Sequence, residues 1–212
     1  MKIMMKNPKM WGVLFCLVLR GGVAENFSPN ARYEVCFTPG GKCTELVVDA
    51  IQSAQSQIQV QAYSFTSKPI EEALIEAHQR GVKVRVIVDK SVVTTDNNAA
   101  ELLSRYHIPV WVDNRPSIAH NKVMIIDHQK VITGSFNFTK SAQTRNAENI
   151  IMIEDNHLAD SYFRNWQKRQ AVSDFFVSQG SEKIKVPKRE APSSAKLWLD
   201  HSSKVLMQVL ER

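Results

Sequence analysis

An apolar run at residues 82–88, VKVRVIV, constrains the fold of this chain more than any other stretch. Apolar residues at this density predict a strand of the kind that is buried between two layers of helices. The segment before it predicts an amphipathic helix, with Pro69 in its first turn and Gly81 past its end. Helices therefore alternate with buried strands, which is the pattern of an α/β fold.

The same alternation continues in both directions along the chain. We expect strands at residues 33–37, 57–63, 82–88, 109–112, 120–127, 130–135 and 147–153, and helices near residues 44–53, 98–106, 139–142 and 156–168. This order predicts a mixed β-sheet with helices on both faces. Residues 31–170, about 140 residues, are enough for one hydrophobic core and form one expected domain.

Polar residues interrupt the apolar pattern at residues 120–137, HNKVMIIDHQKVITGSFN. The polar tetrapeptide at 127–130 predicts a tight turn, so the segment is expected to be a β-hairpin. The notable side chains are His120, Lys122, Asp127, Gly134, Ser135 and Asn137. Because side chains alternate faces along a strand, His120 shares a face with Lys122, and Ser135 with Asn137.

Asp127 and Gly134 are expected to support this group and not to react. Asp127 is seven residues from His120, an odd number, so it faces away from the histidine and is placed to bond backbone amides at the turn. Gly134 lets another backbone or a ligand approach closely.

The four remaining side chains suit phosphodiester chemistry. They supply a nucleophile or base, a fixed cation and two neutral hydrogen-bonding groups for phosphate oxygens. The reaction that this set predicts is phosphoryl transfer.

The spacing H-x-K-x4-D-x6-G-S-x-N resembles the signature of the phospholipase D superfamily at all six positions. The surrounding segments CFTPGGKCTELVVDAI, QAYSFTSKPIEEALIEAHQRGVKVRVIVDKS and NAENIIMIED resemble the small endonucleases of conjugative plasmids, a branch related to a mitochondrial-surface member. The resemblance covers about residues 33–168 and implies a phospholipase D-like fold.

The resemblance also implies roles for the residues. His120 would attack phosphorus and form a phosphohistidine, while Lys122, Ser135 and Asn137 hold the phosphate. Glu148, which shares a face with Asn146, is the candidate for orienting the histidine. No metal or other cofactor is implied, because histidine supplies both nucleophile and acid.

This chain has one copy of the motif, whereas many superfamily members carry two. A second subunit is therefore expected to supply the acid, which predicts a homodimer with a composite site at its interface. The favoured substrate is nucleic acid, DNA and also RNA, cut without sequence specificity. A phospholipase D acting on phosphatidylcholine-like lipids is the alternative, and a non-catalytic module that binds nucleic acid or membrane is a third.

Residues 1–24 predict a secretory signal peptide, with a basic start, an apolar centre and small residues before Glu25. Arg20 is atypical there, so an uncleaved membrane anchor stays an alternative. The leader holds four of the 27 basic residues, which leaves 23 against 21 acidic ones and a net charge of only +2. Such a small charge carries little information about partners. The expected location is periplasmic or extracellular.

Cys36 and Cys43 are seven residues apart across a Pro-Gly-Gly turn. In an oxidising compartment a disulfide is the natural hypothesis, with two buried thiols as the alternative. Beyond the expected domain, residues 171–212 are polar and rich in mixed charge, which is typical of a linker. Their last segment, KLWLDHSSKVLMQVLER, is compatible with an amphipathic helix or a frayed tail.

Overall fold

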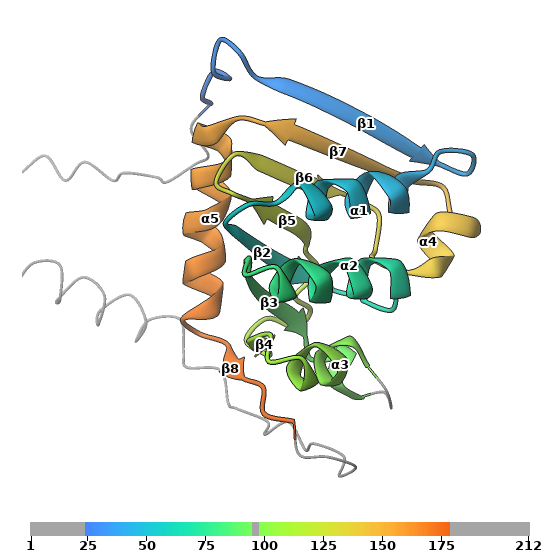
Figure 1. The fold of residues 1–212 in the computed structure, drawn as a ribbon, viewed down its shortest axis with the longest axis vertical. Coiled ribbons are helices and arrows are strands. Elements are labelled where there is room, and N and C mark those ends of the chain that lie inside the picture. Colours follow the sequence, from blue (N-terminus) through green and yellow to red (C-terminus); the bar gives the residue numbers. More distant parts are fainter. Residues whose placement is uncertain (1–23, 95–97, 179–212) are drawn as a thin grey trace, which may run out of the picture.

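The helix and strand pattern folds into a mixed sheet with helices on both faces, which confirms the predicted fold class (Figure 1). The computed structural model describes residues 24–94 and 98–178. Within them the strands are β1 (Arg32–Thr38), β2 (Gln57–Ala62), β3 (Lys83–Asp89), β4 (Val110–Asp113), β5 (Lys122–Ile126), β6 (Lys130–Gly134), β7 (Glu148–Glu154) and β8 (Asp174–Phe175). The helices are α1 (Cys43–Ser53), α2 (Lys68–Gln79), α3 (Ala99–Arg105), α4 (Lys140–Thr144) and α5 (Asn156–Gln170), with a 3₁₀ turn at Val92–Thr94.

The described strands form one sheet in the order β1-β7-β6-β5-β2-β3-β4-β8. Strands β2, β3 and β4 are parallel and are joined by crossovers that contain helices. The other neighbouring pairs are antiparallel. The predicted hairpin of β5 and β6 therefore lies in the middle of the sheet, between β2 and β7.

Side-chain alternation divides the core between the two faces of the sheet. On β5, Met124 and Ile126 pack into the large core under α1, α2 and α3, whereas Val123 and Ile125 pack against α5. Trp166 of α5 is fully buried on that second face and donates a hydrogen bond to the Val60 carbonyl. The period of two thus decides which helix layer each strand residue meets.

The turn between β5 and β6 depends on Asp127. Asp127 and His128 both have φ of 54°, a left-handed backbone that Asp tolerates better than most residues. The Asp127 carboxylate accepts hydrogen bonds from the backbone N–H groups of Gln55, Ser56 and Gln57, at 2.8 to 2.9 Å, and from the Ser56 hydroxyl. We expected it to bond amides at its own turn. Instead it caps the chain that enters β2.

A disulfide joins Cys36 of β1 to Cys43 at the start of α1, with an S–S distance of 2.02 Å. The short α4 packs against the loop that this bond closes. Gln143 of α4 accepts a hydrogen bond from Thr44 N–H at 2.8 Å and donates one to the Gly41 carbonyl at 2.8 Å. The N-terminal edge of the fold is thereby fastened to a helix about 100 residues further along the chain.

The fold extends further than the predicted domain boundary at residue 170. Strand β8 lies within the segment expected to be a linker. It pairs with β4, so that Phe175 and Trp111 are partners on adjacent strands and their rings are in contact. Phe176 is buried. The polar sequence of segment 171–212 therefore begins after these two aromatic residues, which pack the chain against the edge of the sheet.

Residues 1–23, nearly all of the expected leader, and residues 179–212, with the expected C-terminal helix, lie outside the described residues. Among the residues that are described, none of the helices combines the length and the apolar character needed to cross a membrane.

Replacing Asp127 by Asn should lower the free energy of unfolding by about 1 to 3 kcal/mol, because amides would lose a charged acceptor. Desolvation alone would raise the pKa of Asp127, but the hydrogen bonds from Gln55, Gln57 and Ser56 outweigh it and lower the pKa. A carboxyl with a lowered pKa stabilises the fold above its unfolded value of about 4, and this contribution is lost as the pH falls further.

Urea denaturation at pH 7 and at low pH measures this effect. The wild type and Asp127→Asn should differ most at pH 7 and converge in acid. Asp160→Asn is the matched control, because Asp160 is an exposed acid that pairs with His128 at the surface and should contribute little. Equal losses in the two variants would contradict the assignment.

Candidate active site

The strand order brings the predicted site residues together at one end of the sheet. Lys122 begins β5, Gly134 ends β6 and Glu148 begins β7, and these antiparallel neighbours meet at the same edge. An open cavity of about 370 Å³ lies there. Its lining consists of His120, Lys122, Gly134, Ser135, Asn137 and Glu148. Asp127 is at the other end of β5 and is not part of the lining.

Lys122 is buried, and its ammonium contacts the histidine directly. Its Nζ lies 3.0 Å from His120 Nε2 and donates a hydrogen bond to the His120 carbonyl at 3.1 Å. A charged ammonium can only donate, so this contact requires an unprotonated Nε2. Burial lowers the pKa of Lys122, and the nearby Glu148 carboxylate partly opposes that fall. The pair therefore places an imidazole acceptor nitrogen in contact with a fixed positive charge.

Tyr63 is a site residue that the sequence reasoning missed. Its ring centroid lies 4.4 Å from that of His120, and Lys122 Nζ lies 4.9 Å from the Tyr63 centroid. Its backbone N–H donates to the carbonyl of Asn121 at 2.8 Å. Tyr63 follows β2, and β2 pairs with β5 so that Ala62 faces Lys122. An aromatic residue at the end of a predicted strand was the only available signal.

Glu148 takes part in a hydrogen-bonded group with Ser135 and Asn146. Ser135 Oγ donates to Glu148 Oε2 at 2.6 Å, and Asn146 Nδ2 donates to Oε1 at 2.9 Å. Asn146 and Glu148 thus share a face, as predicted. Within the described residues Glu148 has no hydrogen bond to the His120 ring, and its expected role in orienting the histidine stays a prediction.

Asn137 and Gly134 complete the lining. The side-chain oxygen of Asn137 is buried, and it has no hydrogen-bond partner among residues 24–94 and 98–178. Buried polar atoms nearly always have a partner. An amide oxygen accepts, so the partner that Asn137 lacks is an N–H or O–H donor. Gly134 has a φ of 151°, and a Cβ there would collide with the Asn149 carbonyl. Glycine therefore allows β6 and β7 to approach closely beside the cavity.

The cavity combines one nitrogen nucleophile, one cation and neutral hydrogen-bonding groups. Its only carboxylate is Glu148, and within the described residues no group of three or more His, Cys, Asp or Glu side chains comes together as a metal site would need. This set of groups matches an anionic tetrahedral centre such as a phosphodiester.

The family is decided by a match to the model described as "Cardiolipin synthase, PLD-like domain", over residues 47–169. This chain belongs to the phospholipase D superfamily. A protein named phospholipase D from Rickettsia prowazekii (strain Madrid E) is 50% identical over 145 residues, which are 68% of this chain and 71% of that protein. Mitochondrial cardiolipin hydrolase from Homo sapiens is 29% identical over 134 residues, 63% of this chain and 53% of that protein.

Among solved structures, the phospholipase D family member Nuc from Salmonella typhimurium matches with a TM-score of 0.67 and 38% identity, over 69% of this chain and 98% of that chain. The match covers almost the whole of that protein. Together with the family match, these likenesses make the chain a phosphodiester hydrolase of the phospholipase D superfamily.

Replacing Glu148 by Gln should lower the pKa of Lys122 further, because the variant removes the negative charge that opposes desolvation. An NMR titration of the Lys122 side chain measures the shift. Glu154→Gln, at the opposite end of β7, is the control and should leave the Lys122 pKa unchanged. A Lys122 pKa that stays the same or rises in Glu148→Gln would show that the two charges do not interact.

Proposed function

We propose that this chain is a secreted or periplasmic endonuclease that hydrolyses DNA without sequence specificity and without a metal, and that also accepts RNA. The observation that carries the proposal is the contact between His120 Nε2 and Lys122 Nζ in a cavity that also holds Ser135 and Asn137. It supplies a nucleophile, a charge for the phosphate oxygens and donors to hold them.

In the proposed reaction, a His120 nitrogen attacks phosphorus and a P–N bond forms while the bond to the leaving oxygen breaks. The leaving oxygen takes a proton from His120 of the partner subunit. Water then attacks the phosphohistidine, gives its proton back to the partner's His120, and the P–N bond breaks. One histidine must be neutral and the other protonated, so each site needs both chains of a homodimer.

Exposed cations in the segment between two lining residues support a polyanionic substrate. Lys140 and Arg145 are exposed at the two ends of α4, which lies between Asn137 and Glu148 in the chain. Cations next to the reacting phosphate can contact further phosphates of a nucleic-acid backbone, and such contacts carry no base information. The sequence resemblance to the plasmid endonucleases points the same way.

The second candidate function is a phospholipase D that acts on phosphatidylcholine-like lipids. The name of the Rickettsia relative, at 50% identity, favours it. Both candidates use the same phosphodiester chemistry and differ in what the ester connects.

The proposed location outside the cytoplasm rests on the leader pattern of residues 1–24 and on the disulfide between Cys36 and Cys43. Disulfides persist mainly in oxidising compartments. N-terminal sequencing of protein recovered from the periplasm tests the location, and a start at or near Glu25 is expected.

Purified protein in excess EDTA should cut plasmid DNA and RNA and leave phosphatidylcholine vesicles unchanged, because the proposed mechanism needs no Lewis acid. The three substrates are assayed side by side, with His120→Asn as the inactive control. Hydrolysis of the lipid alone would establish the second candidate. Activity that EDTA abolishes and Mg²⁺ or Zn²⁺ restores would overturn the mechanism.

A forced heterodimer of wild-type and His120→Asn chains tests the composite site. It has no complete pair of nucleophile and acid, so its turnover should fall far below half that of the wild-type dimer linked in the same way. Independent sites would retain about half. Light scattering supplies the matching measurement of size, and a fully active monomer would refute the shared site.

A further inference from the structure

His120 lies near the end of the loop at residues 114–121, which connects β4 to β5. Two buried carboxylates flank this loop where two parallel strands end. Asp89 is the last residue of β3 and Asp113 the last residue of β4, and the two are paired in register across the sheet. Both are almost fully buried, with exposed fractions of 2% and 1%. Neither lines the cavity.

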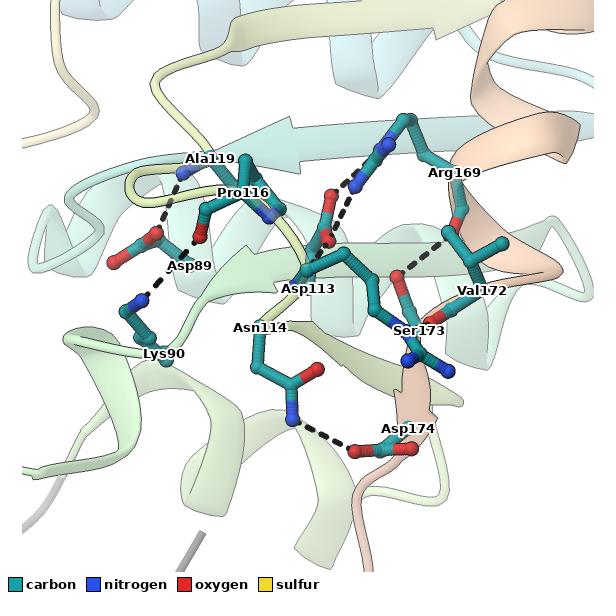
Figure 2. Close-up of polar contacts among 11 residues, drawn as sticks. Asp89, Lys90, Asp113, Asn114, Pro116, Ala119, Arg169, Val172, Ser173 and Asp174 are labelled. Carbon is teal, nitrogen blue, oxygen red and sulfur yellow. Dashed lines mark hydrogen bonds and ion pairs between the residues drawn. The ribbon is translucent and has the colours of Figure 1, made fainter. Parts of the chain in front are cut away.

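The Asp89 carboxylate binds the loop immediately before the histidine (Figure 2). Its Oδ2 accepts a hydrogen bond from the Ala119 N–H at 2.7 Å, and its Oδ1 accepts one from the Ser91 N–H at 2.9 Å. Ala119 is itself buried. Lys90 adds a second attachment, because its Nζ donates to the Pro116 carbonyl at 3.3 Å. Residues at the end of β3 thus form two hydrogen bonds to the loop, and one of them is to the residue adjacent to His120.

Asp113 secures the other side of the loop to α5. It accepts two hydrogen bonds from the Arg169 guanidinium, at 2.8 and 2.6 Å (Figure 2). Arg115 at the start of the loop donates from Nε to the Val172 carbonyl at 2.8 Å. These contacts fix where the loop begins, whereas the Asp89 contact fixes where it ends.

We propose that Asp89 is a positioning residue for His120, acting through its hydrogen bond to the Ala119 N–H. The proposal rests on the proposed function, in which His120 is the nucleophile. A buried carboxylate holds the peptide group next to His120, so a shift of Ala119 moves the imidazole relative to Lys122 and the phosphate. Misplacement of a reacting group by about 1 Å can lower a rate by about 100-fold.

Asp89→Asn is the direct test, because the amide keeps the shape but offers one acceptor atom and one donor to two N–H groups. Asp155→Asn is the matched control. Asp155 is also buried, at 4% exposed, and also accepts two backbone N–H groups, from Leu158 at 2.9 Å and Ser28 at 2.6 Å. It caps α5 at the opposite end of β7 from the cavity.

Both variants should lose stability, but only Asp89→Asn should lower kcat, by about 10- to 100-fold with KM within about twofold. Turnover is measured on bis(p-nitrophenyl) phosphate, a small phosphodiester that does not depend on the choice between nucleic acid and lipid. The temperature is kept well below the unfolding transition of each variant. Equal kcat values for the two variants, or an effect on KM alone, would overturn the proposal.

An NMR readout separates this proposal from the proposed function. The imidazole signals of His120 should shift in Asp89→Asn and stay in place in Asp155→Asn, whether or not His120 is the nucleophile. If His120→Asn keeps its activity, the proposed function fails, while unchanged His120 signals in Asp89→Asn make the positioning role fail. Should Asp89→Asn not fold, Asp89→Glu keeps the charge but adds a methylene group, and a displaced Ala119 should again lower kcat.

Discussion

The antiparallel register of β5, β6 and β7 is the constraint on which the site depends. Met124 and Ile126 must face the core under α1 and α2, and the same alternation turns Lys122 toward that face. Slipping β5 by one residue would bury the wrong side chains and move Lys122 to the face that α5 covers. The register that buries the apolar residues of this short strand therefore also fixes the face on which Lys122 lies.

Regular periodicity made most of the fold predictable from the sequence. The hairpin was expected at residues 120–135 and lies at 122–134, and the helix expected at 156–168 is α5. Strand β8 was not predicted, because two residues carry no period and their pairing with β4 depends on chain far away in the sequence. Local sequence pattern therefore predicted the longer helices and strands. It could not predict β8, which forms only by pairing with a distant strand.

The residues of the candidate site were likewise predictable only in part. The motif residues other than Asp127 line the cavity together with Glu148, because they lie on or next to adjacent strands and the turn between β5 and β6 is short. Tyr63 and Asp89 were missed, since spacing in the chain does not show either contact. Tyr63 reaches His120 through the pairing of β2 with β5, and Asp89 reaches the loop before His120 from the end of β3. The partners of Glu148 were also beyond prediction, because alternation tells which face a side chain takes and not which hydrogen bond it forms.

The ends of parallel strands in open α/β sheets commonly receive ligands. Here the carboxylates at the ends of β3 and β4 are occupied by the protein itself, through the Ala119 amide and the Arg169 guanidinium. The cavity lies instead on the neighbouring antiparallel half of the sheet, at the ends of β5, β6 and β7.

The pairing of β1 with β7 sets the order in which the cavity can be assembled. Thr38, the last residue of β1, accepts a hydrogen bond from the Glu148 N–H at 3.1 Å, and its Oγ lies 3.0 Å from the Asn146 carbonyl. One wall therefore joins the first strand of the sheet to a strand more than 100 residues later. A growing chain has both the histidine and the lysine before Glu148 is added, so it cannot complete that wall until then.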